Sequence, residues 1–305
     1  MLSHDLLAYD RELTLNALRS RSAGMLCLVV TSVGWGVNWS AMKFLMRELP
    51  PLFARGVAGV TAALIIAVIA VALGERLKVQ RGEVGRLAAA SFFNVFAWMG
   101  FSTLSMRWLG AGEGALLVYT MPIWATLMAW PILGKRPTGR SIAGLALCFG
   151  GVSLLFGGHE FALGADKIPG VAFALAAAIL FALGTIVMAP LTLPPFASLA
   201  WQLAIGCTPM VIIGLLFEHP DFSALTPRGW SLLAYMTIGP MGICYITWFA
   251  ALRRLPPATA SVATLLTPVV GVTAAALFLG EPLGAKEWLA MGMTIGGVAL
   301  VMRKS

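Results

Sequence analysis

The sequence predicts an all-α membrane protein with ten transmembrane helices, arranged as two inverted repeats of five helices. Three observations lead to this prediction. Of the 305 residues, 59% are hydrophobic and 11% are charged, whereas a soluble globular domain has about 25% charged residues. Apolar stretches long enough to cross a bilayer recur along the chain. The second half of the sequence also repeats features of the first.

The connections between the apolar stretches are short, so they leave no room for a soluble domain of useful size. The predicted spans cover residues 23–44, 52–73, 87–106, 113–133, 141–157, 169–189, 195–217, 229–251, 258–279 and 286–302. Residues 1–22 precede the first span, and their acidic residues interrupt any signal-peptide core. We expect this segment to be cytoplasmic, either as a short helix on the bilayer surface or as a disordered tail.

The distribution of positive charge predicts the orientation of the chain. With both termini on one side, that side collects 14 Lys and Arg residues and the other side collects 7. Positive loops stay in the cytoplasm, so both termini are expected to lie inside, in the inner membrane of the cell. The net charge of +8 therefore reflects contact with the lipid bilayer and not with nucleic acid.

An internal repeat becomes visible when the sequence is shifted by 146 residues. Residues 104–156 then align with the second half without a gap. The matched positions include Arg107 with Arg253, Pro122 with Pro268, and Leu133-Gly134 with Leu279-Gly280. Five helices per copy force the second copy to enter the membrane from the opposite side. We therefore expect inverted repeats at 23–157 and 169–302, an architecture typical of secondary transporters.

Three stretches resemble the EamA type of the drug/metabolite transporter superfamily. They read "WGVNWSAMKFLMRELPPLFARGVAG", "STLSMRWLGAGEGALLVYTMPIWATLMAWPILGKRPT" and, as the second copy, "YITWFAALRRLPPATASVATLLTPVVGVTAAALFLGEPL". The resemblance covers roughly residues 24–302. It implies ten helices, cytoplasmic termini and export of small metabolites, with bacterial exporters of amino acids, including aromatic ones, as the nearest members.

Polar and aromatic residues near the middle of several spans are expected to line a central cavity, because such groups usually face the interior of a helix bundle. Each of them is also compatible with an interhelical contact or an interfacial position. The candidate substrate-binding residues are Trp35, Asn38, Asn94, Trp98, Tyr119, Trp201, Gln202, Tyr245, Trp248 and Thr264. Trp201 and Gln202 are adjacent, so at most one of them points inward. We expect Trp39 to face away.

Two prolines, Pro122 and Pro268, lie at matching depths in the two copies. A proline inside a helix removes a hydrogen bond and displaces the carbonyl four residues earlier, here those of Val118 and Thr264. We expect both helices to bend near the middle of the membrane. The bends serve either as hinges for alternating access or only for packing.

Charged residues are scarce inside the spans. Glu113, at the start of the fourth span, is the one acidic residue placed to reach the interior. Relatives often carry an acid immediately before the ninth-helix proline, where this chain has Thr267. We therefore expect weak ion coupling or none, with Glu113 as the single candidate. Lys43 and Arg55 are expected to reach lipid head groups, and a role in an outer vestibule is the alternative.

A cavity of this composition suits a ligand with an aromatic or apolar body and a small polar head. The sequence thus predicts an exporter of amino acids, including aromatic ones; lipophilic cations or drugs, and sugar-linked metabolites, are the alternatives. An enzyme is not expected, because the spans contain no nucleophile with its base and no facing acids. The four Cys are isolated and the three His are peripheral, so we expect no metal and no cofactor. The oligomeric state stays open, and a monomer is compatible with the sequence.

Overall fold

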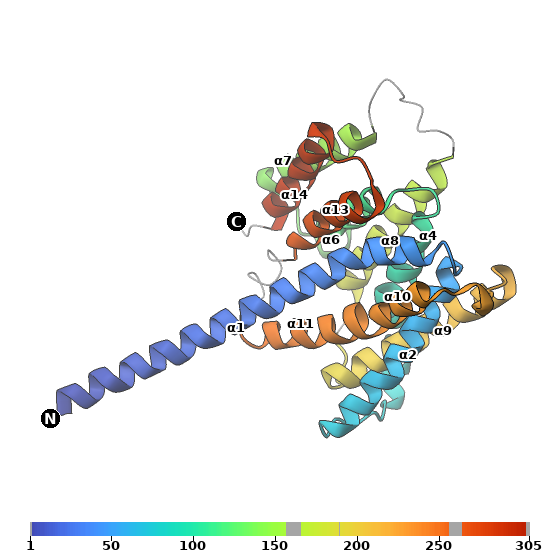
Figure 1. Ribbon diagram of the computed structural model, residues 1–305. Helices are drawn as coiled ribbons and strands as arrows, with labels where there is room; N and C mark the ends of the chain where they lie inside the picture. Colours follow the sequence, from blue (N-terminus) through green and yellow to red (C-terminus); the bar gives the residue numbers. More distant parts are fainter. Residues whose placement is uncertain (1, 157–165, 189, 256–263, 303–305) are drawn as a thin grey trace.

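The computed structural model describes residues 2–156, 166–188, 190–255 and 264–302, and all regular structure in these ranges is helical (Figure 1). The first half contains α1 (Leu2–Leu45), α2 (Pro51–Ala72), η1 (Arg81–Glu83), α3 (Val84–Ser91), η2 (Phe92–Phe101), α4 (Ser102–Ser105), α5 (Ala111–Val118), α6 (Met121–Leu133) and α7 (Gly139–Phe156). The second contains α8 (Ile168–Val187), α9 (Pro195–Phe217), η3 (Phe222–Ala224), α10 (Pro227–Ile238), η4 (Gly239–Ile243), α11 (Cys244–Leu252), α13 (Leu266–Leu279) and α14 (Ala285–Met302).

Seven stretches of the described chain are long and apolar enough to cross a membrane. They are Arg21–Leu45, Pro51–Ala72, Arg81–Ser105, Ala111–Leu133, Ile168–Val187, Pro195–Phe217 and Pro227–Leu252. The apolar helix α13 is shorter, and α7 and α14 have 18 residues each. The protein is therefore a multi-pass membrane protein, and a count of ten spans stays a prediction.

Helix α1 is longer than the sequence predicts. It runs without interruption from Leu2 to Leu45 and projects from the rest of the molecule at its N-terminal end (Figure 1). Residues 2–22 thus continue the first predicted span instead of forming a separate helix on the membrane surface.

Several helices begin at a proline. Pro51, Pro195 and Pro227 are the first residues of α2, α9 and α10. Proline suits this position because its φ is already helical and its missing N–H would have no partner within the helix. At α10, Oγ1 of Thr226 also accepts a hydrogen bond of 3.1 Å from the backbone N–H of Gly229, which caps the helix. The starts of these helices are therefore encoded locally.

The two halves of the chain interlock through reciprocal contacts. Helix α1 packs against α11 and α13, and α8 packs in the same way against η2 and α6. The second helices of the two halves, α2 and α9, pack against each other along their lengths. Helices α7 and α14 form a further pair, on the other side of the molecule from α2 and α9 (Figure 1). The main hydrophobic core therefore lies along the contacts between the halves.

Several backbone features recur at equivalent positions of the two halves. The π-helical segments η2 and η4 overlap when the sequence is shifted by 146 residues. Gly134, with φ of 69°, ends α6, and Gly280, with φ of 71°, ends α13. Both adopt the left-handed conformation that glycine reaches without a steric penalty. The sequence repeat is thus matched by a repeat in backbone conformation.

The structure interrupts the helix close to Pro122, inside the candidate span Ala111–Leu133, and the hinge role of the two matched prolines stays a prediction. Helix α5 ends at Val118 and α6 begins at Met121, which places Pro122 in the first turn of α6. Pro268 lies in the first turn of α13. The carbonyl of Thr264 is not freed, because it accepts a hydrogen bond of 3.0 Å from the N–H of Thr267. In the candidate span Ala111–Leu133 the break lies at Tyr119 and Thr120, and Pro122 follows in the first turn of α6.

Close packing of α7 on α14 yields a stability prediction. A Cβ atom at Gly297 would lie 2.5 Å from the carbonyl oxygen of Gly144, whereas one at Gly292 meets nothing within 4 Å. We expect Gly297→Ala to destabilise the protein by about 1–3 kcal/mol through overpacking. The matched control Gly292→Ala is expected to change stability by less than about 0.5 kcal/mol. Thermal unfolding in detergent measures both; equal melting temperatures would contradict the packing described.

Candidate functional site

A cavity of about 840 Å³ lies between the two halves. Its walls come from α1, α2, α3, η2, α4, α6, α8, α9, η4 and α11, together with Thr264 and Leu265 before α13. Of the residues that the sequence predicts as substrate-binding, those lining the cavity are Trp35, Asn38, Asn94, Trp98, Tyr119, Gln202, Tyr245, Trp248 and Thr264. Pro122 lines it as well. Residues far apart in the sequence thus share one cavity.

One wall carries a first aromatic group made of Trp35, Tyr245 and Trp248. The ring of Trp35 lies edge-on to Tyr245 with centroids 5.4 Å apart, and its centroid is 5.9 Å from that of Trp248. The indole N–H of Trp35 donates a 3.0 Å hydrogen bond to the carbonyl of Pro240 in η4. The irregular backbone of η4 therefore holds an aromatic side chain of α1 in place.

A second aromatic group consists of Trp39, Trp98, Tyr119 and Phe181. The ring centroids of Tyr119 lie 6.4 Å from Trp39 and 6.0 Å from Trp98, and Trp98 lies 4.8 Å from Phe181. Trp39 is 7% exposed and lines the cavity, so the expectation that it faces away is wrong. It turns inward because α1 is covered by protein on several sides, not on one stripe.

The amide side chains of the cavity differ in their bonding. Asn94 of η2 donates a 2.9 Å hydrogen bond to Gln202 of α9, and Gln202 donates one of 3.0 Å to Ser198. These two amides therefore join helices as well as lining the cavity. Asn38 is buried, and its Oδ1 has no hydrogen-bond partner among the described residues. Asn38 is thus the amide left available to a ligand.

Trp201 lies outside the cavity, in contrast to its neighbour Gln202. Its side chain is 38% exposed, and its indole N–H donates a 2.8 Å hydrogen bond to the carbonyl of Leu77. Trp201 is rotated by about 100° around α9 relative to Gln202, and its indole points to the connection that contains Leu77. Trp201 is therefore an anchor at the surface, and its prediction as a substrate contact is not supported.

Arg55 lies inside the protein and lines the cavity, although the sequence analysis places it at lipid head groups. Its side chain is 8% exposed. Helix α2 packs so closely on α9 that a Cβ on Gly56 would lie 2.7 Å from the backbone nitrogen of Val211. This packing encloses the first turns of α2. The signal was present in the sequence, since Arg55 is the one charge within the predicted span 52–73.

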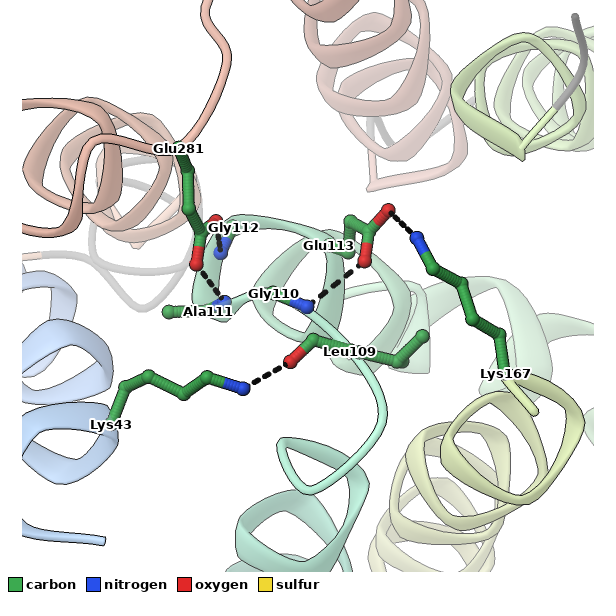
Figure 2. Close-up of polar contacts among 8 residues, drawn as sticks. All are labelled: Lys43, Leu109, Gly110, Ala111, Gly112, Glu113, Lys167 and Glu281. Carbon is green, nitrogen blue, oxygen red and sulfur yellow. Dashed lines mark hydrogen bonds and ion pairs between the residues drawn. The ribbon is translucent and has the colours of Figure 1, made fainter. Parts of the chain in front are cut away.

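Carboxylates from two parts of the chain bind the N-terminus of α5. Glu281 accepts hydrogen bonds from the backbone N–H groups of Ala111, at 2.6 Å, and Gly112, at 3.0 Å. Lys43 donates to the carbonyl of Leu109, at 2.7 Å, and also to that of Met106. Figure 2 shows Glu281, from the loop after α13, and Lys43, from α1, reaching this turn. Lys43 is therefore a bridge between helices and not a free head-group contact.

Glu113 completes the same turn. One of its carboxylate oxygens accepts a 2.9 Å hydrogen bond from the N–H of Gly110, and the other forms a 2.9 Å ion pair with Lys167 (Figure 2). A carboxylate at this position caps the helix and complements its dipole. Both oxygens of Glu113 are thus used in a structural role, and the side chain is absent from the described lining of the cavity.

A third carboxylate, Glu218, binds nearby at the start of α2. Glu218 accepts a 3.0 Å hydrogen bond from the backbone N–H of Phe53 and pairs with Arg107 at 2.8 Å. Lys43, Arg107 and Glu218 line one shallow depression there. We call the contacts of Glu281, Glu113, Glu218 and Lys43 the end seal. They join connecting segments of both halves by charge-assisted hydrogen bonds, which are stronger than neutral ones.

The described residues contain no group of three or more His, Cys, Asp or Glu side chains that could hold a metal ion. The arrangement instead offers aromatic faces, hydroxyl groups, amides and one guanidinium around the cavity. These groups can bind and release a small molecule by noncovalent contacts.

Fold and cavity together define a multi-pass membrane protein that encloses a substrate-sized cavity between two interlocked halves. The EamA-like transporter family matches the chain twice, at residues 22–157 and 168–303. The chain belongs to this family of transporters.

Individual relatives support the assignment along the whole chain. The chain is 26% identical to the uncharacterized transporter YvbV of Bacillus subtilis, over 94% of this chain and 93% of that protein. It is 28% identical to a probable amino-acid metabolite efflux pump of Salmonella typhimurium, over 93% of each. A protein of the same description from Escherichia coli is 27% identical over 92% of this chain and 94% of its own. One crystal structure has the same fold, with a TM-score of 0.64, 17% identity, and coverage of 92% of this chain and 96% of that one.

The end seal gives a second stability prediction. Replacing Glu281 with Ala leaves the backbone N–H groups of Ala111 and Gly112 without their acceptor. We expect the loss of about 1–3 kcal/mol, since unmet buried donors carry a desolvation penalty. Glu281→Gln keeps one carbonyl oxygen and is expected to lose less. Thermal unfolding measures the order wild type, Gln, Ala; an Ala variant as stable as wild type would show that the seal contributes nothing.

Proposed function

We propose that this protein exports small metabolites from the cytoplasm across the inner membrane, and that its cargo is amino acids, including aromatic and hydrophobic ones. In this proposal it works by alternating access through the central cavity, between two inverted five-helix repeats whose termini are cytoplasmic. The observation that carries the proposal is the aromatic and amide lining of that cavity.

The size and chemistry of the cavity support a small organic cargo. Pockets for small molecules typically measure about 300–1,000 Å³ and combine apolar walls with a few polar groups; this one measures about 840 Å³. Its two aromatic groups suit an apolar or aromatic body, and Asn38 suits a polar head. Two relatives that match nearly the whole chain are described as probable amino-acid metabolite efflux pumps.

The position of the end seal supports access to the cavity from the opposite side in this conformation. Cavity-lining residues at the other end include Met188 and Leu191, in the connection between α8 and α9. The charge distribution of the sequence assigns that connection to the cytoplasm. We infer that the structure represents an inward-facing state, with the end seal on the outer side. Release to the outside then requires the contacts of Glu281 and Glu218 to break.

The backbone irregularities supply places where such a change can occur. The breaks after Val118 and before Leu266, and the π-helical segments η2 and η4, all border the cavity. Segments of this kind often coincide with functional hinges. We propose that one half rocks against the other about these paired points.

Weak ion coupling, or none, remains part of the proposal. Glu113 was the one acidic candidate, and its two oxygens are committed to Gly110 and Lys167. The lining described for the cavity contains no acidic side chain. Net flow is then set by the gradient of the cargo. Export of lipophilic cations is the alternative, favoured by the same aromatic faces, which attract cations.

Transport by proteoliposomes tests the cargo directly. We expect vesicles loaded with unlabelled phenylalanine to take up labelled phenylalanine by exchange, and uptake to be reduced by tryptophan and leucine. Tetraphenylphosphonium and glucose are expected to have no effect, and dissipating the proton gradient is expected to leave exchange unchanged. Competition by tetraphenylphosphonium but by no amino acid would replace the proposal with the cation alternative.

A pair of substitutions tests the cavity as the transport site. Asn38→Leu removes the unpaired amide at nearly constant volume, so we expect phenylalanine exchange to fall by about 10-fold or more, equivalent to one lost hydrogen bond to a charged group. Trp201→Phe, on the neighbouring surface, is the control and is expected to retain exchange near the wild-type rate. A loss in Trp201→Phe with full activity in Asn38→Leu would place the site elsewhere.

A further inference from the structure

We propose that Arg55 is the carboxylate receptor of the cavity, so that the cargo is an organic carboxylate with an aromatic or apolar body. This assignment rests on the proposed function, because it takes the cavity to be the transport site. It goes beyond that proposal by naming the group that selects the cargo.

Within the part of the chain that the structure describes, the side chain of Arg55 lacks protein partners. Nε and Nη1 of Arg55 are buried and have no hydrogen-bond partner among the described residues. The ion pairs found among the described residues do not include Arg55, and the described lining of the cavity contains no acidic side chain. Arg55 therefore has three properties together: it is buried, it lines the cavity, and no acid of the described chain pairs with it.

Burying the unpaired guanidinium of Arg55 costs free energy. An arginine cannot lose its proton in a protein, so the guanidinium remains charged. Burying an unpaired charge is strongly unfavourable, in a membrane as in a protein core. Such a group persists where it serves a function. An anionic ligand repays the cost by supplying both the opposite charge and the missing acceptors.

The geometry of the guanidinium matches that of a carboxylate. Its planar fork of N–H groups binds two oxygens at once. Arg55 is the one charged side chain among the described lining residues. A single positive charge balances a monoanion, whereas a phosphate monoester carries nearly two negative charges at neutral pH. Charge matching thus favours a carboxylate over a phosphate.

The position of Arg55 relative to the two aromatic groups favours a cargo with an aromatic or apolar body. Arg55 lines the same cavity as Tyr245 of the first aromatic group and Tyr119 of the second. A ligand whose carboxylate binds Arg55 therefore has the faces of both aromatic groups available in one cavity for its body. In an amino acid, the ammonium group can donate to the unpaired Oδ1 of Asn38.

The test compares ligands that differ at one group. The purified protein is titrated with phenylalanine, phenylalaninamide, 3-phenylpropanoate, phenethylamine and phenyl phosphate, and binding is followed by quenching of tryptophan fluorescence. We expect wild type to bind phenylalanine and 3-phenylpropanoate at least 10-fold more tightly than phenylalaninamide and phenethylamine. In Arg55→Gln this preference disappears, and in Arg55→Lys it is partly retained. Arg47→Gln, an exposed arginine outside the described cavity lining, keeps the wild-type preference.

Stability without ligand separates a binding role from a structural one. If Arg55 serves to bind an anion, Arg55→Met removes an unpaired buried charge. The melting temperature of this variant in ligand-free detergent solution then equals or exceeds that of wild type. The stabilisation of wild type by 3-phenylpropanoate is lost in this variant. A structural arginine would instead give a lower melting temperature in Arg55→Met and a carboxylate preference that survives in Arg55→Gln, and this result overturns the proposal.

The remaining outcomes separate this inference from the proposed function. Amino-acid exchange by wild type, with an unchanged carboxylate preference in Arg55→Gln, overturns the role of Arg55 and leaves amino-acid export standing. Binding of 3-phenylpropanoate that depends on Arg55, without any amino-acid exchange, supports the receptor and overturns amino acids as cargo. Tighter binding of phenyl phosphate than of 3-phenylpropanoate, or of phenethylamine than of phenylalanine, overturns the carboxylate assignment.

Discussion

The structure depends on one constraint: backbone that leaves the helical pattern at membrane depth must be buried in protein or line a cavity. The chain leaves the α-helix at η2 and η4 and at the breaks before α6 and α13. All four places border the same central space. The interlocked packing of the two halves makes this arrangement possible, because each half covers the irregular segments of the other.

Carboxylates at helix starts form the second organising feature. Glu281 binds the N-terminus of α5 and Glu218 that of α2, each from a distant part of the chain. These contacts meet unpaired N–H groups of helix ends while joining different segments. Hydrogen bonds to water can replace these contacts when the segments separate. The apolar packing between α2 and α9 cannot be replaced by contacts with water. The molecule thus combines a firm core with a separable end.

The sequence predicts the membrane class, the family and the repeat. Nine of the ten side chains it names as substrate-binding line the cavity, because polar residues in the middle of a span usually face the interior of the bundle. It misplaces Arg55 and Trp39 because depth and helical face were judged from a single helix. Their true surroundings are set by α9 packing over α2 and by the helices that surround α1, which no local pattern contains. Trp201 is the converse case, since its polar atom is satisfied by the carbonyl of Leu77 in a loop. Glu113 looked like a free acid because its partner Lys167 lies 54 residues away in the sequence.

The proposed binding of the cargo through Arg55, in one cavity between the halves, can be tested by an experimental structure of the protein in lipid nanodiscs with bound phenylalanine. We expect density for the ligand between the two aromatic groups, with its carboxylate oxygens about 3 Å from the guanidinium nitrogens of Arg55. Density for phenylalanine at another place, or a ligand in the cavity with its carboxylate turned away from Arg55, would contradict it.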